Sequence, residues 1–337
     1  MAALDLSIVP EERRNLVHAV VDAAFGTTAH AIAAVAGGWS GALTYRVDAS
    51  DGPFLIRVEM IRGFVRNPYQ YDCMRIAAEA GIAPPIRHLD ADAGVVVMPF
   101  LTARPLSDHP GGPLGVARDA GALLARLHQT VPFRAHGDYL TNLTTMVQFL
   151  EGSGRVAPGL LQPHRAGFER IRAAYPWQPE RFVSSHNDPN EQNLLFDGRR
   201  LWLVDWETAS RSDPFIDAAI MASYLAPTND LRHVLLSAWL GRPPDRLDQA
   251  RLALMARITQ LYVGCVLLLI AVDPATPRHT DLAAMDLDEL RATFARGDLV
   301  GGTAVGSIAF AKTMLQMFLD SLTTPDLDES LRVIALG

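Results

Sequence analysis

The segment HNDPNEQNLLFDGRRLWLVDWE, residues 186–207, holds the residues that decide the fold and the chemistry of this chain. A polar loop carries Asp188, and Asn193 follows it within the same loop. Two short apolar runs then flank the turn Asp197-Gly198, which is typical of a hairpin. The far run ends at a second carboxylate, Asp205. Because a hairpin brings its two ends together, we expect Asn193 and Asp205 to share one edge, with Asp188 nearby.

Carboxylate and amide oxygens of this kind are ligands for Mg²⁺, which takes few protein ligands together with substrate phosphates. Asp188 could then orient and deprotonate a hydroxyl group. Asp and Asn are also common in turns, so one of these residues alone indicates little. The whole set, preceded by a glycine-rich segment and a hairpin, favours a catalytic site.

Upstream of this segment, the first hundred residues indicate a small sheet with one helix among its strands. The predicted strands are 42–47, 54–58, 86–89 and 95–98, and the predicted helices are 13–25 and 69–80. After Pro105 the pattern becomes mostly helical, with one embedded hairpin. We therefore predict an α+β chain with a β-rich N-terminal lobe over 1–100, a hinge near 98–104 and a helical C-terminal lobe over 101–337.

Composition excludes several classes of protein. With 49% hydrophobic and 20% charged residues among 337, the chain is not expected to be disordered. A net charge of −7 argues against a nucleic-acid-binding role. The longest apolar run, Leu261–Val272, is too short to span a bilayer, and Met1–Glu12 shows no secretory signal. We expect a cytoplasmic protein that binds neither nucleic acid nor membrane.

The pattern His186-x-Asp188-x-x-x-x-Asn193, with the segments Val204–Glu207 and Ser212–Asp217, resembles the aminoglycoside phosphotransferase and choline kinase family. These are small-molecule kinases with a bilobal, protein-kinase-like fold. The HND and DWE spellings are closer to the choline, ethanolamine and thiamine kinase branch. The resemblance covers about residues 30–225.

The resemblance implies a role for each matching residue. Asp188 matches the catalytic base, and Asn193 and Asp205 match the pair that binds Mg²⁺. The implied cosubstrate is ATP. The residues expected to bind it are Gly38, Ser40 and Gly41 in the glycine-rich segment, Arg57 on the second predicted strand, and Met98 and Phe100 at the hinge. His186 is expected to organise the loop, and Asp217 to brace it by accepting backbone N–H bonds.

Arg57 departs from the usual pattern, in which a lysine neutralises the nucleotide phosphates. Of the 30 basic residues, Lys312 is the single lysine and lies far along the chain. Arginine keeps the charge and offers a planar fork of donors, so we expect Arg57 to take this role. Candidates for its partner on the helix 69–80 are Asp72, Glu79 and the neutral Gln70.

The sequence predicts transfer of the γ-phosphoryl group of ATP to a hydroxyl of a small, amine-bearing molecule, and leaves the acceptor open. Aromatic residues would suit a quaternary ammonium group and carboxylates would suit an aminosugar or polyamine. The aromatic candidates are Trp206, Tyr224, Trp239 and Tyr262, and the acidic ones are Asp230, Asp286, Asp288 and Glu289. The alternative is a non-catalytic nucleotide-binding or interaction module on the same fold. Oligomeric state and the choice between ATP and GTP also remain open.

Overall fold

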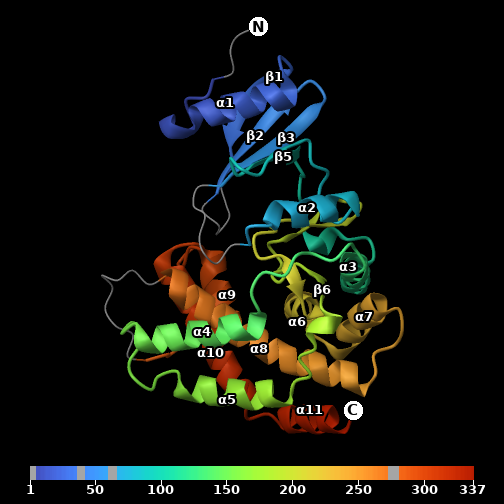
Figure 1. Ribbon diagram of the computed structural model, residues 1–337, viewed down its shortest axis with the longest axis vertical. Helices are drawn as coiled ribbons and strands as arrows, with labels where there is room; N and C mark the ends of the chain where they lie inside the picture. Colours follow the sequence, from blue (N-terminus) through green and yellow to red (C-terminus); the bar gives the residue numbers. More distant parts are fainter. Residues whose placement is uncertain (1–4, 36–41, 60–66, 272–280) are drawn as a thin grey trace.

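The computed structural model describes residues 5–35, 42–59, 67–271 and 281–337, and Figure 1 shows a sheet-containing N-terminal part above a mostly helical C-terminal part. The N-terminal sheet has the strand order β1-β2-β3-β5-β4, and every neighbouring pair is antiparallel. Its strands are β1 (Ala29–Ala34), β2 (Leu43–Ala49), β3 (Gly52–Val58), β4 (His88–Asp90) and β5 (Val95–Pro99). The four predicted strands are confirmed.

Strand β1 is an addition to the prediction. Its sequence, AHAIAA, is mostly alanine, which has little preference for strands, so nothing in the sequence marks it. It pairs with β2 through the register Ile32↔Val47 and extends the sheet on that side.

The sheet is buried on both faces because hydrophobic side chains alternate along its strands. In β5, Val95 and Val97 pack with α1 (Glu11–Phe25), whereas Val96 and Met98 face the core that contains α2 (Gln70–Glu79). Both helices agree with the predicted ranges. Helix α2 ends before Gly81, whose φ of 65° is a left-handed conformation that glycine adopts at low cost. Strand β3 and the region of helix α2 also lie beside the segment 186–207.

The C-terminal part consists of helices around two short hairpin-like sheets. The helices are α3 (Gly112–His128), α4 (Tyr139–Gly152), α5 (Gln162–Ala174), α6 (Pro214–Leu225), α7 (Asn229–Leu240), α8 (Arg246–Ala271), α9 (Leu287–Arg296), α10 (Ala304–Ser321) and α11 (Pro325–Leu336), with short 3₁₀ turns at Leu106–Asp108 and Pro179–Arg181. Strand β6 (Val183–Ser185) pairs with β9 (Ser210–Ser212), and β7 (Leu194–Phe196) pairs with β8 (Leu201–Leu203). This α+β, protein-kinase-like arrangement is the fold class that the sequence predicts.

Helix α8 runs through the C-terminal part and packs against α6, α10 and α11 (Figure 1). Among the helices of the described residues it is the one whose length and composition would allow a membrane crossing. Just over half of its most apolar window, 56%, is buried against the rest of the chain. Its apolar side chains, including Leu254, Ile258 and Leu261, belong to the large hydrophobic core. A helix buried in a protein core passes the same test of length and composition, so this test alone is weak evidence for a membrane span.

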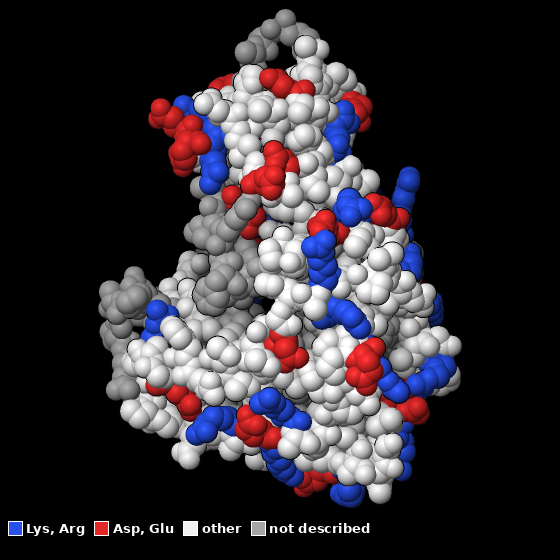
Figure 2. Space-filling model, viewed as in Figure 1, with Lys and Arg blue, Asp and Glu red and all other residues white. Residues whose placement is uncertain are grey.

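Charged side chains of both signs are intermingled on the face of the molecule shown in Figure 2, over both the N-terminal and the C-terminal parts. Among the described residues, charged side chains pair across short distances, such as Arg75 with Glu79 on α2 and Arg170 with Asp328. This face has no broad basic surface of the kind that tracks a nucleic-acid backbone.

One buried titratable group lies in the helical core away from all the residues discussed so far. His164 in α5 is 1% exposed, and its ring stacks at 6.0 Å on the Phe318 ring of α10. Burial lowers the pKa of His164 to about 4, although the backbone of Leu315 opposes this shift. The folded protein therefore holds His164 as the neutral imidazole at neutral pH.

We predict that His164 makes the fold less stable as the pH falls from about 6.5 to about 4. In that window the unfolded chain binds a proton that the folded chain excludes, so the free energy of unfolding drops by up to about 3 kcal/mol. Urea unfolding at pH 7.5 and pH 5 measures this loss. His164→Met should show a smaller loss between the two pH values, and His18→Gln, on the exposed side of α1, should match the wild type. Equal losses in wild type and His164→Met would contradict the prediction.

Candidate active site

The β7–β8 hairpin brings Asn193 and Asp205 together, as its sequence predicts. Leu194 pairs with Leu203 in the hairpin. In the next pair toward its open end, the Val204 N–H donates to the Asn193 carbonyl oxygen at 3.0 Å. Asp197 fixes the turn by accepting N–H bonds from Arg199 and Arg200. Asn193 therefore lies at the open end of the hairpin beside Asp205.

Asp188 lies against the same end of the hairpin. The Asn193 side-chain nitrogen donates to the Asp188 carbonyl oxygen at 2.9 Å, and the Asn190 side-chain nitrogen donates to Asp188 Oδ1 at 2.9 Å. With its nitrogen so engaged, the Asn193 amide presents its oxygen, Oδ1, which accepts no hydrogen bond from any described residue. The three residues predicted from the sequence are thus adjacent.

Two of the residues in this loop adopt left-handed backbone conformations. Asn187 has a φ of 64° and Asp205 a φ of 65°, and in the described residues these are the non-glycine positions with positive φ. Such conformations are costly except for Asn and Asp, and they cluster at functional sites. Asn187 turns the chain directly before Asp188, and Asp205 turns it shortly before Glu207.

Asp217, in the first turn of α6, holds the loop in this shape. Its carboxylate accepts the backbone N–H of His186 at 2.9 Å and that of Asn187 at 2.7 Å. Burial would raise the pKa of Asp217, but hydrogen bonding and charge from His128 and His186 hold it below its usual range. Asp217 therefore stays ionised and braces the loop, as we expected.

A second chain of hydrogen bonds, through His128 and Trp239, also holds the Asp217 carboxylate. The Trp239 indole N–H donates to His128 Nδ1 at 2.8 Å, and His128 Nε2 lies 3.1 Å from Asp217 Oδ2. Because an indole can only donate, Nδ1 must accept, and the ring hydrogen sits on Nε2. His186 is likewise completely buried, with Nε2 at 2.9 Å from the Val204 carbonyl oxygen. Both histidines organise the site from within the core.

The environment of Asp188 raises its pKa to about 7. The main cause is loss of hydration on burial, which the hydrogen bond from Asn190 partly offsets, and the negative charges of Asp205, Glu207 and Asp217 raise the pKa further. A carboxyl group with a pKa near 7 exchanges protons readily at neutral pH and suits a general base.

Arg57 reaches this group of carboxylates from strand β3. Its Nη2 lies 3.0 Å from Asp205 Oδ1 and 3.3 Å from Glu207 Oε2, and its side chain is only 10% exposed. Asp72 and Glu79, candidates for its partner, instead lie on the exposed side of α2 beside Arg75. Gln70, the neutral candidate, donates to the buried Glu59 at 3.1–3.2 Å. The structure therefore corrects the expected pairing, and Glu207 joins the site.

The segment that starts α2 is joined to the carboxylate loop. The Asn67 backbone N–H donates to the Glu207 carbonyl oxygen at 2.9 Å, and the Asn67 side chain donates to the Ala209 carbonyl oxygen. Asn67 is 1% exposed, so this joint between the two parts of the chain is buried. Sequence reasoning missed it because no local pattern marks Asn67.

The remaining nucleotide-binding candidates fall into two groups. Gly38, Ser40 and Gly41 lie outside the described residues. Met98 is buried in β5 and pairs with Leu55, and the Phe100 N–H donates to the Pro53 carbonyl oxygen at 2.9 Å. The Phe100 N–H is thus engaged in the sheet, so a contact from Phe100 to a nucleotide base would use its carbonyl oxygen or its ring.

The four aromatic candidates for an acceptor pocket fall into two pairs that differ in burial. Trp206 and Trp239 are core residues, packed on His186 and Phe215 respectively. Tyr224 and Tyr262 are partly exposed, and burial followed by the negative charge of Asp188 raises the pKa of each to about 12. Both hydroxyls therefore lie within the electrostatic range of Asp188.

A further aromatic residue, Tyr139 in α4, belongs with them. Its ring stacks on Tyr262 with centroids 3.9 Å apart and planes 14° apart. Burial, Tyr262 and Asp188 all raise the pKa of Tyr139. Sequence reasoning did not single out Tyr139, because only the packing of α4 on α8 brings it to this place. Among the acidic candidates, Asp286 caps α9, the Asp288 side chain is 95% exposed, and Glu289 and Asp230 lie in the first turns of α9 and α7.

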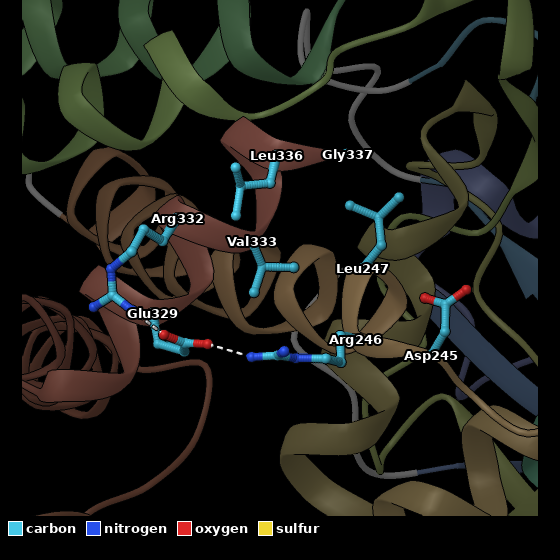
Figure 3. Close-up of a pocket in the computed structure, with 8 residues that line it drawn as sticks. All are labelled: Asp245, Arg246, Leu247, Glu329, Arg332, Val333, Leu336 and Gly337. Carbon is cyan, nitrogen blue, oxygen red and sulfur yellow. Dashed lines mark hydrogen bonds and ion pairs between the residues drawn. The ribbon is translucent and has the colours of Figure 1, made fainter.

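An open hollow of about 580 Å³ lies at the far end of the helical part and contains none of these residues. Leu247, Val333 and Leu336 line it between the start of α8 and α11, and the Arg246–Glu329 ion pair at 2.7 Å lies along its edge (Figure 3). It is separate from the candidate active site.

The donor set at the hairpin fits a magnesium ion. No three His, Cys, Asp or Glu side chains gather into a metal-binding group in the described part of the chain. Asp205 and the unengaged Oδ1 of Asn193 instead offer two hard oxygen ligands at one edge, with Glu207 close by. This small set matches Mg²⁺, which keeps water and substrate phosphates as its other ligands.

Solved structures with the same fold include small-molecule kinases of two kinds. A choline/ethanolamine kinase family protein from Mesorhizobium loti is 21% identical, with 91% of this chain and 92% of that chain covered and a TM-score of 0.65. The choline kinase LicA from Streptococcus pneumoniae is 14% identical, with coverage of 91% and 100% and a TM-score of 0.62. A spectinomycin phosphotransferase, solved with ADP and spectinomycin, is 14% identical, with coverage of 89% and 98% and a TM-score of 0.56.

No curated protein matches the chain. The profile of the phosphotransferase enzyme family matches residues 31–252, which include Arg57, Asp188, Asn193 and Asp205. The match spans well over half of the chain and includes Arg57 and the segment 186–207, whereas Tyr262 lies beyond it. The chain therefore belongs to the phosphotransferase enzyme family.

Proposed function

We propose that this protein is an ATP-dependent kinase that transfers the γ-phosphoryl group to a hydroxyl of a small, amine-bearing molecule. The observation that carries the proposal is the convergence of Asp188, Asn193 and Asp205 at one end of a hairpin, with Arg57 facing them from the N-terminal sheet. A non-catalytic module would have no need for this arrangement. One structure of the same fold was solved with ADP, which supports the choice of nucleotide.

In this proposal Asn193 and Asp205 hold the metal, and Glu207 adds negative charge beside them. When bound, Mg²⁺ would neutralise phosphate oxygens during transfer. Arg57 contributes a fixed positive charge and a planar set of donors to the same phosphates. Catalysis then depends mainly on position and charge.

Asp188 acts as the base in this proposal. It accepts the proton of the acceptor hydroxyl while the oxygen is held in line with the γ-phosphoryl group. The hydrogen bond from Asn190 to Oδ1 leaves Oδ2 as the oxygen nearer to Asn193 and available to the acceptor. The raised pKa of Asp188 brings it close to neutral pH, so it can take up the proton and release it again.

The acceptor is proposed to carry a cationic amine. Tyr224 and Tyr262 are partly exposed, and the buried Tyr139 stacks on Tyr262; all three lie close enough to Asp188 for its charge to raise their pKa values. Aromatic faces attract ammonium groups, and the surrounding carboxylates add to that attraction. The proteins of known structure with this fold include kinases named for choline and ethanolamine, and a kinase for spectinomycin.

The first prediction is that the protein adds one phosphate to an amine-bearing alcohol when supplied with Mg²⁺ and ATP. A mass-spectrometric screen of choline, ethanolamine, thiamine, aminoglycosides and neutral sugars would identify the acceptor. Asp188→Asn should lower turnover about 10³-fold because the base is lost, and nucleotide binding should persist. Glu191→Gln, an exposed neighbour in the same loop, should keep normal turnover. Near-normal turnover in Asp188→Asn would rule out the assigned base.

The second prediction concerns Arg57. Arg57→Met should weaken binding of Mg·ADP by about tenfold or more, since a charge-assisted hydrogen bond is worth about 1.5–3 kcal/mol, and Arg57→Lys should recover part of the loss. Isothermal titration calorimetry measures both affinities. Arg75→Met, which removes an exposed arginine from α2, is the matched control and should bind as the wild type does. Unchanged affinity in Arg57→Met would show that Arg57 does not hold the phosphates.

The third prediction concerns the metal. Asp205→Ala should remove the dependence of nucleotide binding on divalent ions, because half of the proposed pair of protein ligands is lost. Electron paramagnetic resonance of Mn²⁺, with and without ADP, reports the bound ion directly. Asp197→Asn, in the turn of the same hairpin, should bind Mn²⁺ normally. If Asp205→Ala still binds Mn²⁺ and ADP as tightly as the wild type, Asp205 is not a ligand.

A further inference from the structure

A buried ion pair fixes the start of α6, the helix that carries Asp217. Asp213 caps this helix by accepting the Phe215 N–H at 2.8 Å, and it also accepts the Tyr175 hydroxyl at 3.2 Å. Arg251 Nη2, from the second turn of the core helix α8, lies 3.0 Å from the second Asp213 oxygen. The Asp213 side chain is 2% exposed and that of Arg251 is 13% exposed.

The surroundings of this pair restrict its geometry. The Arg251 guanidinium lies 4.3 Å from the centroid of the Phe215 ring and 5.6 Å from that of Tyr175. Arg251 is thus held by aromatic faces as well as by the Asp213 carboxylate. A buried charge pair adds little net stability compared with apolar packing, but it specifies one relative position of two helices. Here those helices are α6 and α8.

Only one turn of α6 separates Asp213 from Asp217, so a shift at the cap moves both residues together. Asp217 in turn binds the backbone N–H groups of His186 and Asn187, directly before Asp188. The ion pair, the first turn of α6 and the Asp217 hydrogen bonds together therefore connect α8 to the proposed base. Apart from Asp188, the connected residues are not among those proposed above to bind the nucleotide, the metal or the acceptor.

We propose that Asp213 and Arg251 are positioning residues for catalysis, which set the place of Asp217 and through it the loop that presents Asp188. The proposal rests on the proposed function, because it assumes that Asp188 acts on the acceptor. It assigns to the α6–α8 junction a role in the rate of transfer that is distinct from its role in stability.

The same helix offers a matched control in Arg257. This side chain is also buried, at 7% exposure, and its Nη2 lies 2.8 Å from Asp326 and 3.0 Å from Thr324 Oγ1. Arg257 thus joins α8 to the start of α11, away from the catalytic loop. Arg251→Met and Arg257→Met each remove one buried guanidinium from α8 and leave one aspartate without its partner.

The experiment compares Arg251→Met, Arg251→Lys and Arg257→Met by thermal melting, steady-state kinetics and amide hydrogen exchange. We expect both methionine variants to melt at lower temperature than the wild type. Arg251→Met should lower kcat at least tenfold with the affinity for Mg·ADP changed less than twofold, and the His186 and Asn187 amides should exchange faster. Arg251→Lys should recover most of kcat, and Arg257→Met should keep both kcat and the slow exchange of these two amides.

Equal kcat in Arg251→Met and Arg257→Met, with equal exchange at His186 and Asn187, would overturn the proposal. If Arg251→Met does not fold, Tyr175→Phe and Arg251→Gln provide milder changes at the same junction, and unchanged kcat and exchange in both would also overturn it. The exchange measurement needs no acceptor. Absence of turnover in the wild type, or normal turnover in Asp188→Asn, would count against the proposed function. The exchange of the His186 and Asn187 amides tests the positioning role independently of turnover.

Discussion

The two hydrogen bonds from the backbone of His186 and Asn187 to the Asp217 carboxylate are the interaction on which the rest of the site depends. They satisfy a buried carboxylate that would otherwise be strongly unfavourable, and they hold Asn187 in a left-handed conformation that few residues adopt. With the loop fixed in this way, Asp188 meets the end of the hairpin. The hairpin brings Asn193 and Asp205 together, but it would not by itself place Asp188, the proposed base, beside them.

The loop that carries Asp205 and Glu207 is held from both parts of the molecule. From the C-terminal part, the β7–β8 hairpin fixes Asp205 through Val204. From the N-terminal part, Arg57 binds both carboxylates, and Asn67 binds the backbone of the same loop. The proposed metal-binding pair therefore lies where the two parts of the molecule meet. Asp188, the proposed base, follows directly after the loop residues that Asp217 of α6 holds.

The sequence predicted the features that arise from local patterns. The hairpin at 194–204 could be predicted because a strong turn signal separates two apolar runs, and the adjacency of Asn193 and Asp205 follows from that hairpin. The partners of Arg57 could not be predicted, since they lie about 150 positions away and depend on how the two parts meet. Tyr139 was missed for the same reason, and β1 because its alanines carry no strand signal.

The use of arginine in the cleft has a consequence for how this protein can be detected. Reagents that acylate the phosphate-binding lysine of nucleotide sites require an amine nucleophile, and a guanidinium, protonated at all working pH values, does not react with them. The single lysine of the chain, Lys312, lies on α10 beside Asp281, in the helical part and away from Arg57. On the proposed function, surveys of ATP-binding proteins based on lysine labelling would therefore pass over the nucleotide site of this protein.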